Sequence, residues 1–160
     1  THLKEKTVHP RLNFVKAAPD AYKAAAAFDS YIIKESGLEP RLIHLIKLRA
    51  SQINGCAYCV DMHCKESLAD GLSQQWINLV SVWRESPVYD ASERAVLAWT
   101  EAVTHISQTG APDAEFEALK PHFSDEQIAG LTMQLAMINF WNRMAVSMRS
   151  QHPVDRAKAA

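Results

Sequence analysis

Two thiols and an imidazole stand at helical spacing near the middle of the sequence, at Cys56, Cys59 and His63. The Asn54-Gly55 pair before them is a typical helix stop, so Cys56 is expected in the first turn of a new helix. Because an α-helix has about 3.6 residues per turn, the three side chains fall within an arc of roughly 60°. We therefore predict that they touch, whereas Cys64 is turned away from Cys59.

This arrangement favours thiolate chemistry. A free cysteine has a pKa near ~8.5, and a helix N-terminus, a cationic neighbour or CxxC spacing lowers it to roughly 3.5 to 7.5. The unpaired N–H groups at a helix start favour an anion, and His63 can take the proton of Cys59 one turn earlier. A thiolate that attacks a peroxide becomes a sulfenic acid, which a neighbouring thiol converts to a disulfide. We interpret the cluster as a two-electron redox centre.

Two other interpretations of the cysteines remain open. A structural zinc site needs four ligands, and His44 is the only plausible fourth beside Cys56, Cys59 and His63. The thiols can also be inert packing in a core. Three cysteines are an odd number, and the sequence shows no secretion signal. A permanent disulfide framework is therefore not expected, and a reducible pair is favoured.

Length and charge restrict the class of protein. A chain of 160 residues is most simply one domain, and a formal net charge of -1 gives no electrostatic argument for nucleic acid or an anionic membrane. The longest apolar stretches, such as residues 24–28, are far shorter than the ~20 residues of a spanning helix. Residues 1–6 lack a signal-peptide pattern, so we predict a cytoplasmic protein that binds neither nucleic acid nor membrane.

Apolar residues recur three and four apart in successive segments with clear capping and stop signals, and no segment alternates as a strand would. The sequence therefore predicts an all-α fold of six to seven helices, in one domain over residues 1–160 with an extended arm at 1–18 and a loose tail at 150–160. Capping boxes are predicted at Asp90 with Glu93 and at Ser124 with Gln127. The predicted helices run from Pro19 to Gly37, Pro40 to Asn54, Cys56 to Gly71, Ser73 to Ser86, Asp90 to Gly110, Asp113 to Leu119, and Ser124 to about Ser150.

The stretch Arg49-Ala-Ser-Gln-Ile-Asn-Gly-Cys56-Ala-Tyr-Cys59-Val-Asp-Met-His63 resembles the core motif of the AhpD-like alkylhydroperoxidases, within the carboxymuconolactone decarboxylase superfamily. Residues 92–104 and 137–145 resemble flanking helices of that family, so the resemblance spans roughly residues 20 to 149. It implies an all-helical fold with CxxC at the N-terminus of a central helix, assembled as trimers or hexamers. It also implies thiol-dependent reduction of hydroperoxides, without a metal or organic cofactor. The electron donor would be a dihydrolipoyl carrier or a thioredoxin-like protein.

The resemblance implies that Cys59 attacks peroxide, Cys56 resolves the intermediate and His63 relays protons. Spacing also favours Cys59, which lies one helical turn from His63, although the helix terminus favours Cys56. One departure concerns His44, which stands where the family commonly has glutamate. We predict that His63 consequently lacks a carboxylate partner from the preceding helix. We also predict that His44→Glu speeds the reaction of Cys59 about 10-fold, unless His44 is simply a buried, hydrogen-bonded residue.

Two other functions use the same residues differently. A non-catalytic redox sensor would use the disulfide to change its assembly and would turn over slowly with any reductant. Lactone decarboxylation, the other activity named for the superfamily, does not require a CxxC pair. Because 48% of the residues are hydrophobic, we also expect apolar helix faces to be buried between copies of the chain.

Overall fold

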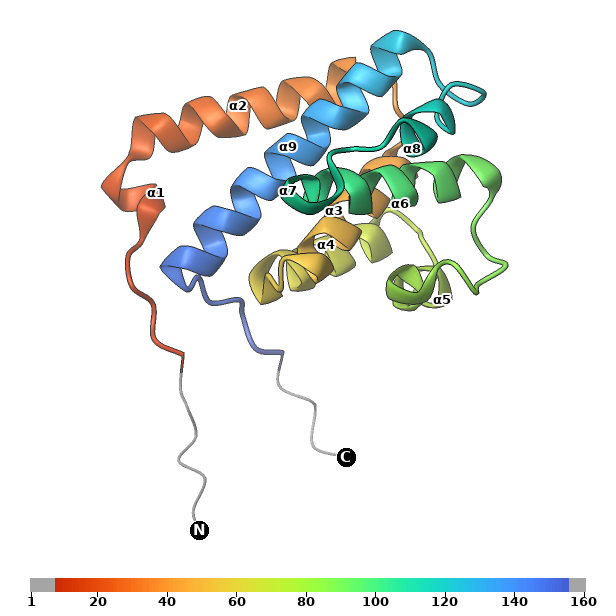
Figure 1. Ribbon diagram of the computed structural model, residues 1–160. Helices are drawn as coiled ribbons and strands as arrows, with labels where there is room; N and C mark the ends of the chain where they lie inside the picture. The colour runs from red at the N-terminus through yellow and green to blue at the C-terminus, as the bar shows by residue number, and fades with distance from the viewer. Residues whose placement is uncertain (1–7, 156–160) are drawn as a thin grey trace, which may run out of the picture.

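The computed structural model describes residues 8–155, which form nine α-helices and one 3-10 helix and contain no strand (Figure 1). The predicted all-α class is confirmed. No helix in this part of the chain is long and apolar enough to cross a membrane. The helices are α1 (Phe14–Ala17), α2 (Pro19–Glu35), α3 (Pro40–Ile53), α4 (Ala57–Ala69), α5 (Gln74–Asn78), η1 (Val80–Val82), α6 (Ala91–Thr104), α7 (Ile106–Thr109), α8 (Asp113–Glu117) and α9 (Asp125–Met148).

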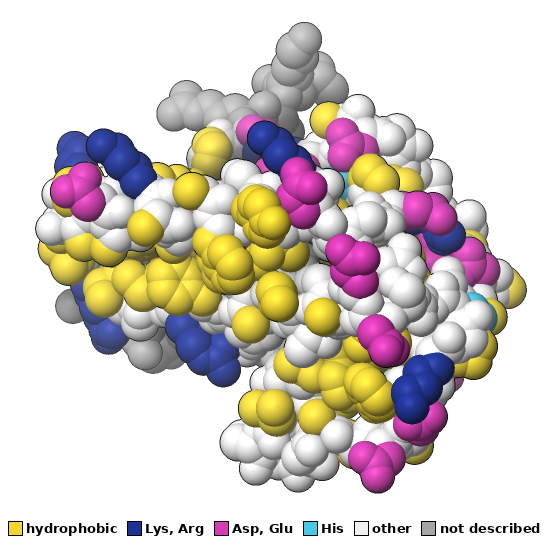
Figure 2. All heavy atoms as spheres, turned by 90° about the horizontal axis from the view of Figure 1, so that it is seen from above, with side chains coloured by type: hydrophobic (Ala, Val, Ile, Leu, Met, Phe, Trp, Pro, Cys, Tyr) yellow, Lys and Arg dark blue, Asp and Glu magenta, His cyan; other side chains and the backbone are white. Residues whose placement is uncertain are grey.

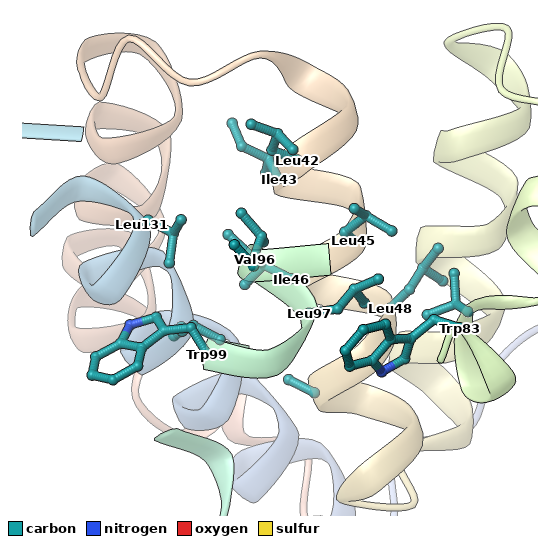
Figure 3. Close-up of a cluster of buried hydrophobic side chains, with 14 of the residues drawn as sticks. Leu42, Ile43, Leu45, Ile46, Leu48, Trp83, Val96, Leu97, Trp99 and Leu131 are labelled. Carbon is teal, nitrogen blue, oxygen red and sulfur yellow. The ribbon is translucent and has the colours of Figure 1, made fainter. Parts of the chain in front are cut away.

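Helix α3 is the centre of the fold and contacts α4, α6 and α9. Pro40 occupies its first turn, where a backbone N–H would have no acceptor within the helix, so proline costs no hydrogen bond there. The helix ends at the Asn54-Gly55 turn. Leu45, Ile46 and Leu48 are completely buried. Figure 3 shows apolar side chains on more than one side of α3, some near Val96 of α6 and Leu131 of α9 and others, Leu45 and Leu48, toward Trp83. A helix buried on nearly all sides is a rigid base for the segment that follows it.

The helices around α3 begin where the sequence predicts. Both capping boxes are present, at Asp90 with Glu93 for α6 and at Ser124 with Gln127 for α9. Helix α2 lies beside α9 across the top of the molecule in Figure 1. Gly55 has a φ of 66°, in the left-handed region that glycine adopts without strain, and this turn leads directly from α3 into α4.

The region predicted as one helix from Ser73 to Ser86 is divided into α5 and η1. The carbonyl of Trp76 accepts a hydrogen bond from the Tyr89 hydroxyl. The guanidinium of Arg94 donates to the carbonyls of Trp83 and Ser86. Backbone acceptors that a continuous helix would use are thus bonded to side chains from later in the sequence, which local patterns do not reveal.

The helix predicted from Asp90 to Gly110 is likewise divided, at His105, into α6 and α7. Other differences lie at the ends of the chain. The part of the predicted extended arm that the structure describes contains the single-turn helix α1, capped by the Asn13 side chain. Residues 1–7 of the arm and 156–160 of the tail lie outside the described residues, so the arm and tail boundaries stay predictions.

Candidate active site

Cys56 and Cys59 form a disulfide at the start of α4, with their Cα atoms 5.3 Å apart. Both side chains are buried, and Cys56 is the N-cap residue, whose Sγ accepts a hydrogen bond from the Cys59 N–H at 3.3 Å. They pack with Ala145 of α9 in a small cluster apart from the main core. The predicted contact between these two thiols is confirmed.

Cys64 is a free thiol and stands apart from the disulfide, as its spacing predicts. It is half-buried against the main core rather than in the cluster of the disulfide. Burial, with a smaller contribution from the charge of Asp61, raises the pKa of the Cys64 thiol. A thiol with a raised pKa is mostly protonated at neutral pH and is a weak nucleophile.

His63 lies one turn after Cys59 on α4 and is buried. Its Nδ1 is 2.8 Å from Oε2 of Glu66, and its buried Nε2 has no hydrogen-bond partner among the described residues. Burial lowers the pKa of His63; the hydrogen bond to Glu66 opposes this shift, and the charge of Lys47 adds to it. With Glu66 ionised, Nδ1 donates to the carboxylate and Nε2 is left as a free base.

Glu66 supplies a carboxylate partner for His63. The hydrogen bond to His63 is the main cause of the lowered pKa of Glu66, which keeps it ionised at neutral pH. The partner comes from the same helix as His63, three residues on, rather than from the preceding helix. Position 44 on the preceding helix supplies no carboxylate to His63, as predicted, and Glu66 of the same helix supplies one instead.

His44 is buried on α3, and its Nε2 is 2.7 Å from Oδ2 of Asp70 at the end of α4. Its other nitrogen, Nδ1, is buried without a partner among the described residues. No hydrogen bond joins it to His63. A glutamate at position 44 would face the Asp70 carboxylate, and like charges at that distance destabilise each other. The structure therefore gives no reason to expect that His44→Glu speeds the reaction of Cys59 with peroxide.

Lys47 is a buried cation that sequence reasoning did not assign to the site. Its Nζ is 3.7 Å from Oδ2 of Asp29 on α2, whose other carboxylate oxygen accepts a hydrogen bond from Gln134. The only signal in the sequence is the spacing of His44, Lys47 and Ser51, which form a polar row on an otherwise apolar helix. A buried ammonium beside the site favours thiolate at a neighbouring cysteine.

A cavity of about 620 Å³ opens beside Cys59, His63, Glu66 and Lys47. We call it the first cavity. Its other walls are largely apolar and come from the N-terminal segment, α2 and α9; they include the rings of Phe14, Tyr22 and Trp141, which pack edge-on or tilted against one another. A concave, mostly apolar space of this size with a few polar groups at one end is typical of a small-molecule site.

Asn142 of α9 holds the turn that precedes the disulfide. It is completely buried, donates to the Ser51 hydroxyl at 3.0 Å, and accepts from the Asn54 amide at 2.9 Å. The Asn54 amide also donates to Asn139 at 3.0 Å. This network joins α9 to the last turn of α3, immediately before Cys56.

The residues of the predicted zinc alternative are not arranged as a metal site. Within residues 8–155, no group of three or more His, Cys, Asp or Glu side chains could hold a metal ion. His44 is bonded to Asp70 and the two cysteines to each other.

The fold and the site define the class to which the chain belongs: single all-helical domains with a CxxC pair at the start of a central helix. The chain is a member of the carboxymuconolactone decarboxylase family, whose model matches residues 19–102. This confirms the AhpD-like resemblance.

Three similar proteins place the chain within the family. YdfG of Bacillus subtilis, which is uncharacterized, is 33% identical over 138 residues, covering 86% of this chain and 93% of YdfG. A protein of Agrobacterium tumefaciens with a crystal structure is 62% identical to this chain, and the two structures superpose with a TM-score of 0.89 over 92% of this chain and 100% of the other. The function of that protein is unknown, and antioxidant defence of the AhpD type has been suggested for it. An AhpD-core, peroxidase-related protein of Ralstonia eutropha JMP134 is 25% identical, with a TM-score of 0.68, covering 88% and 74%.

Proposed function

We propose that this protein reduces organic hydroperoxides or hydrogen peroxide through the Cys56/Cys59 dithiol. The observation that carries the proposal is that Cys59 and His63 both line the first cavity, with Nε2 of His63 free to act as a base. Membership of the AhpD-like family and the suggested antioxidant role of the A. tumefaciens protein support it.

The oxidative half-reaction follows from this geometry. His63 takes the proton of Cys59, and the thiolate attacks the terminal oxygen of the hydroperoxide, so the O–O bond breaks and Cys59 becomes a sulfenic acid. The alcohol oxygen leaves and takes the proton back from His63. Cys56 then attacks Sγ of Cys59, and the hydroxyl leaves as water when it takes a proton. The hydroperoxide has gained two electrons and the protein has gained one disulfide.

The roles of the two cysteines follow from their surroundings. Cys59 lines the first cavity together with His63, whereas Cys56 does not. Cys56 instead sits at the helix N-terminus, where the Cys59 N–H can stabilise its thiolate. We therefore assign the attack on peroxide to Cys59 and the resolving step to Cys56.

A thiol count before and after one equivalent of hydroperoxide tests the proposed function. The reduced protein should lose two thiols, and tandem mass spectrometry should place the disulfide between Cys56 and Cys59. Cys59→Ser should abolish this loss, whereas Cys64→Ser should lose the same two thiols as wild type at the same rate. Unchanged thiols in wild type, or loss confined to Cys64, would contradict a peroxidase function.

We also propose an electron donor for the disulfide and a compartment for the protein. A dihydrolipoyl carrier or a thioredoxin-like protein would reduce the disulfide, and a reducing compartment such as the cytoplasm would supply it. Steady-state peroxide consumption with several dithiol donors separates a peroxidase from the redox sensor. The sensor predicts slow turnover with every donor, together with a change in assembly on oxidation.

We also propose that the protein assembles as a homo-oligomer, a trimer or hexamer, through an apolar face. Met133 and Phe140 lie seven residues apart on α9 and are 48% and 41% exposed. Phe28 and Tyr31 are exposed on α2, and Figure 2 shows hydrophobic side chains gathered on the face viewed from above. Exposed apolar groups gathered in this way favour burial against another copy.

Paired charges on α9 test this assembly. Met133→Glu combined with Phe140→Glu should convert the oligomer to the mass of one chain in sedimentation, because two carboxylates would be buried at the interface. Val82→Glu, at an exposed valine of η1, is the matched control and should keep the wild-type mass. Wild type that sediments as a single chain at micromolar concentration would refute the proposal.

A further inference from the structure

The disulfide stands between two cavities, and each sulfur belongs to a different one. Cys59 lines the first cavity, and Cys56 lines a second cavity of about 350 Å³. Neither cysteine lines both. The second cavity lies where the start of α4 meets the end of α9; the residues shared by the walls of both cavities are Tyr58, Ala145, Ser150 and Gln151.

The two cavities also differ in charge. Lys47 in the first cavity is accompanied by two carboxylates, Asp29 and Glu66. Among the described residues, the second cavity is lined by Arg149 and His152 and by no acidic side chain. None of the salt bridges within the described part of the chain involves Arg149. The N-terminus of the 13-residue helix α4 adds its positive dipole at Cys56.

We propose that the second cavity admits a small thiol reductant that carries a carboxylate, and that this reductant attacks Sγ of Cys56. The inference rests on the proposed thiol redox function of the pair. It specifies the route and the charge class of the electron donor, and it favours a free carboxylate-bearing thiol over a dihydrolipoyl carrier, whose lipoyl group is amide-linked and uncharged. Hydroperoxide thus reaches the reduced Cys59 thiol through the first cavity, and the reductant reaches Cys56 of the oxidised pair through the second.

The electrons and protons balance in two exchanges. The donor thiolate attacks Cys56, the S–S bond breaks, and the bond pair goes to Cys59 beside His63, which restores the cysteine that peroxide oxidises. A second donor thiol then attacks the donor sulfur of the mixed disulfide. Cys56 leaves as a thiolate at the helix N-terminus, where the Cys59 N–H stabilises it. The donor becomes a disulfide, and the protein gains the two electrons and, through solvent, two protons.

A matched pair of dithiols tests the charge class. Dihydrolipoate carries a carboxylate and dihydrolipoamide does not, although their thiols are alike, so their rate ratio isolates the charge. Rapid mixing with the oxidised protein, acid quenching and thiol alkylation should show dihydrolipoate reacting faster by about 3- to 10-fold at low salt. Arg149→Gln should bring the ratio close to one, and Arg149→Lys should retain most of it. A wild-type ratio near one, or a ratio unchanged in Arg149→Gln, would overturn this part of the inference.

The position of the mixed disulfide tests the route. When the oxidised protein is incubated with excess glutathione, quenched in acid and alkylated, tandem mass spectrometry should find the glutathione on Cys56. Filling the second cavity with Val146→Phe should slow disulfide reduction more than filling the first with Met62→Phe, and the order should reverse for oxidation by peroxide. Glutathione on Cys59, or the same order for both half-reactions, would overturn the proposed route.

These measurements on disulfide reduction need no peroxide, so they separate the two proposals. A protein that adds glutathione at Cys56 but does not lose thiols to peroxide would refute the peroxidase function and leave the donor route standing. The opposite result would refute only the donor route.

Discussion

Replacing His63 with glutamine should slow the oxidation of reduced Cys59 by hydroperoxide by about 10² to 10⁴-fold. The imidazole lies one turn from Cys59 and has a free Nε2, whereas an amide side chain of similar size cannot take the thiol proton. Single-turnover thiol loss, followed by rapid quenching with an alkylating reagent, measures this step without a contribution from the electron donor. A rate within threefold of wild type would exclude His63 as the base.

The pH dependence of the same step should show the depressed pKa of His63. Burial disfavours the imidazolium, so the imidazole stays neutral below its ordinary pKa of about 6.5. The wild-type rate should therefore fall on the acid side only below that value, as His63 becomes protonated. If the rate already falls above pH 6.5 through a group that His63→Gln abolishes, the direction of the shift is contradicted.

Glu66→Gln should move this acid limb to lower pH. The hydrogen bond and charge of Glu66 raise the pKa of His63 against the effect of burial, so their removal leaves the imidazolium less stable. Asp61→Asn is a matched control, because Asp61 is a carboxylate on the same helix that pairs with Lys65 instead. It should keep the wild-type pH profile. A shift of the limb in Asp61→Asn equal to that in Glu66→Gln would show a general charge effect rather than a specific partner.

The sequence predicts the parts of this site that depend on a single helix. The stop at Asn54-Gly55 and the three- and four-residue spacings place Cys56, Cys59 and His63 on successive turns at the start of one helix, and the structure confirms a disulfide between the two cysteines. Glu66 also lies three residues from His63, but such a carboxylate can equally point to solvent. Because His63 is buried, its Nδ1 needs a hydrogen-bond partner within the protein, and Glu66 is that partner. The burial of His63 cannot be predicted from the spacing alone.

The remaining contacts depend on how helices meet. His44 and Asp70 are 26 residues apart, and their pairing requires the start of α3 to lie beside the end of α4. The pairing of Lys47 with Asp29 likewise requires α2 to lie against α3. Helical periodicity shows which face of each helix is apolar but not which helix covers it, so neither pair could be assigned from the sequence.

The second cavity also could not be predicted from the sequence, because it depends on which helix ends meet. Its wall combines the N-terminus of α4 with the C-terminus of α9 and the residues just after it. Arg149 is placed there because α9 ends with this residue in the left-handed conformation, at a φ of 55°. Local patterns place the end of α9 near residue 150, but they do not place it beside Cys56.

Asn142→Ala should lower the free energy of unfolding by about 2 to 4 kcal/mol. Alanine removes the amide that bonds Ser51 and Asn54 and leaves a space between α9 and α3, so the buried Ser51 hydroxyl loses the Asn142 amide as a donor. Urea unfolding of the reduced and the oxidised protein measures the change. A loss below 1 kcal/mol in both states would show that water or a rearranged side chain replaces Asn142.

A double-mutant cycle separates the network from simple packing. Ser51→Ala combined with Asn142→Ala should cost less than the sum of the single changes, with a coupling of roughly 0.5 to 3 kcal/mol, because each single change already breaks the shared hydrogen bond. Thr132→Ala is the control, since Thr132 is half-buried on the same helix but bonds Trp99, outside this network. Its energy should simply add to that of Ser51→Ala.

The same network should matter for the chemistry, because Asn54 and Gly55 directly precede Cys56. When the turn is no longer tied to α9, reduced Cys56 samples more positions relative to Cys59, and formation of the disulfide from the sulfenic acid should slow. A trap for sulfenic acid, added with one equivalent of hydroperoxide, should then label Cys59 more in Asn142→Ala than in wild type. Labelling equal to wild type in a destabilised variant would mean that the network supports the fold without positioning Cys56.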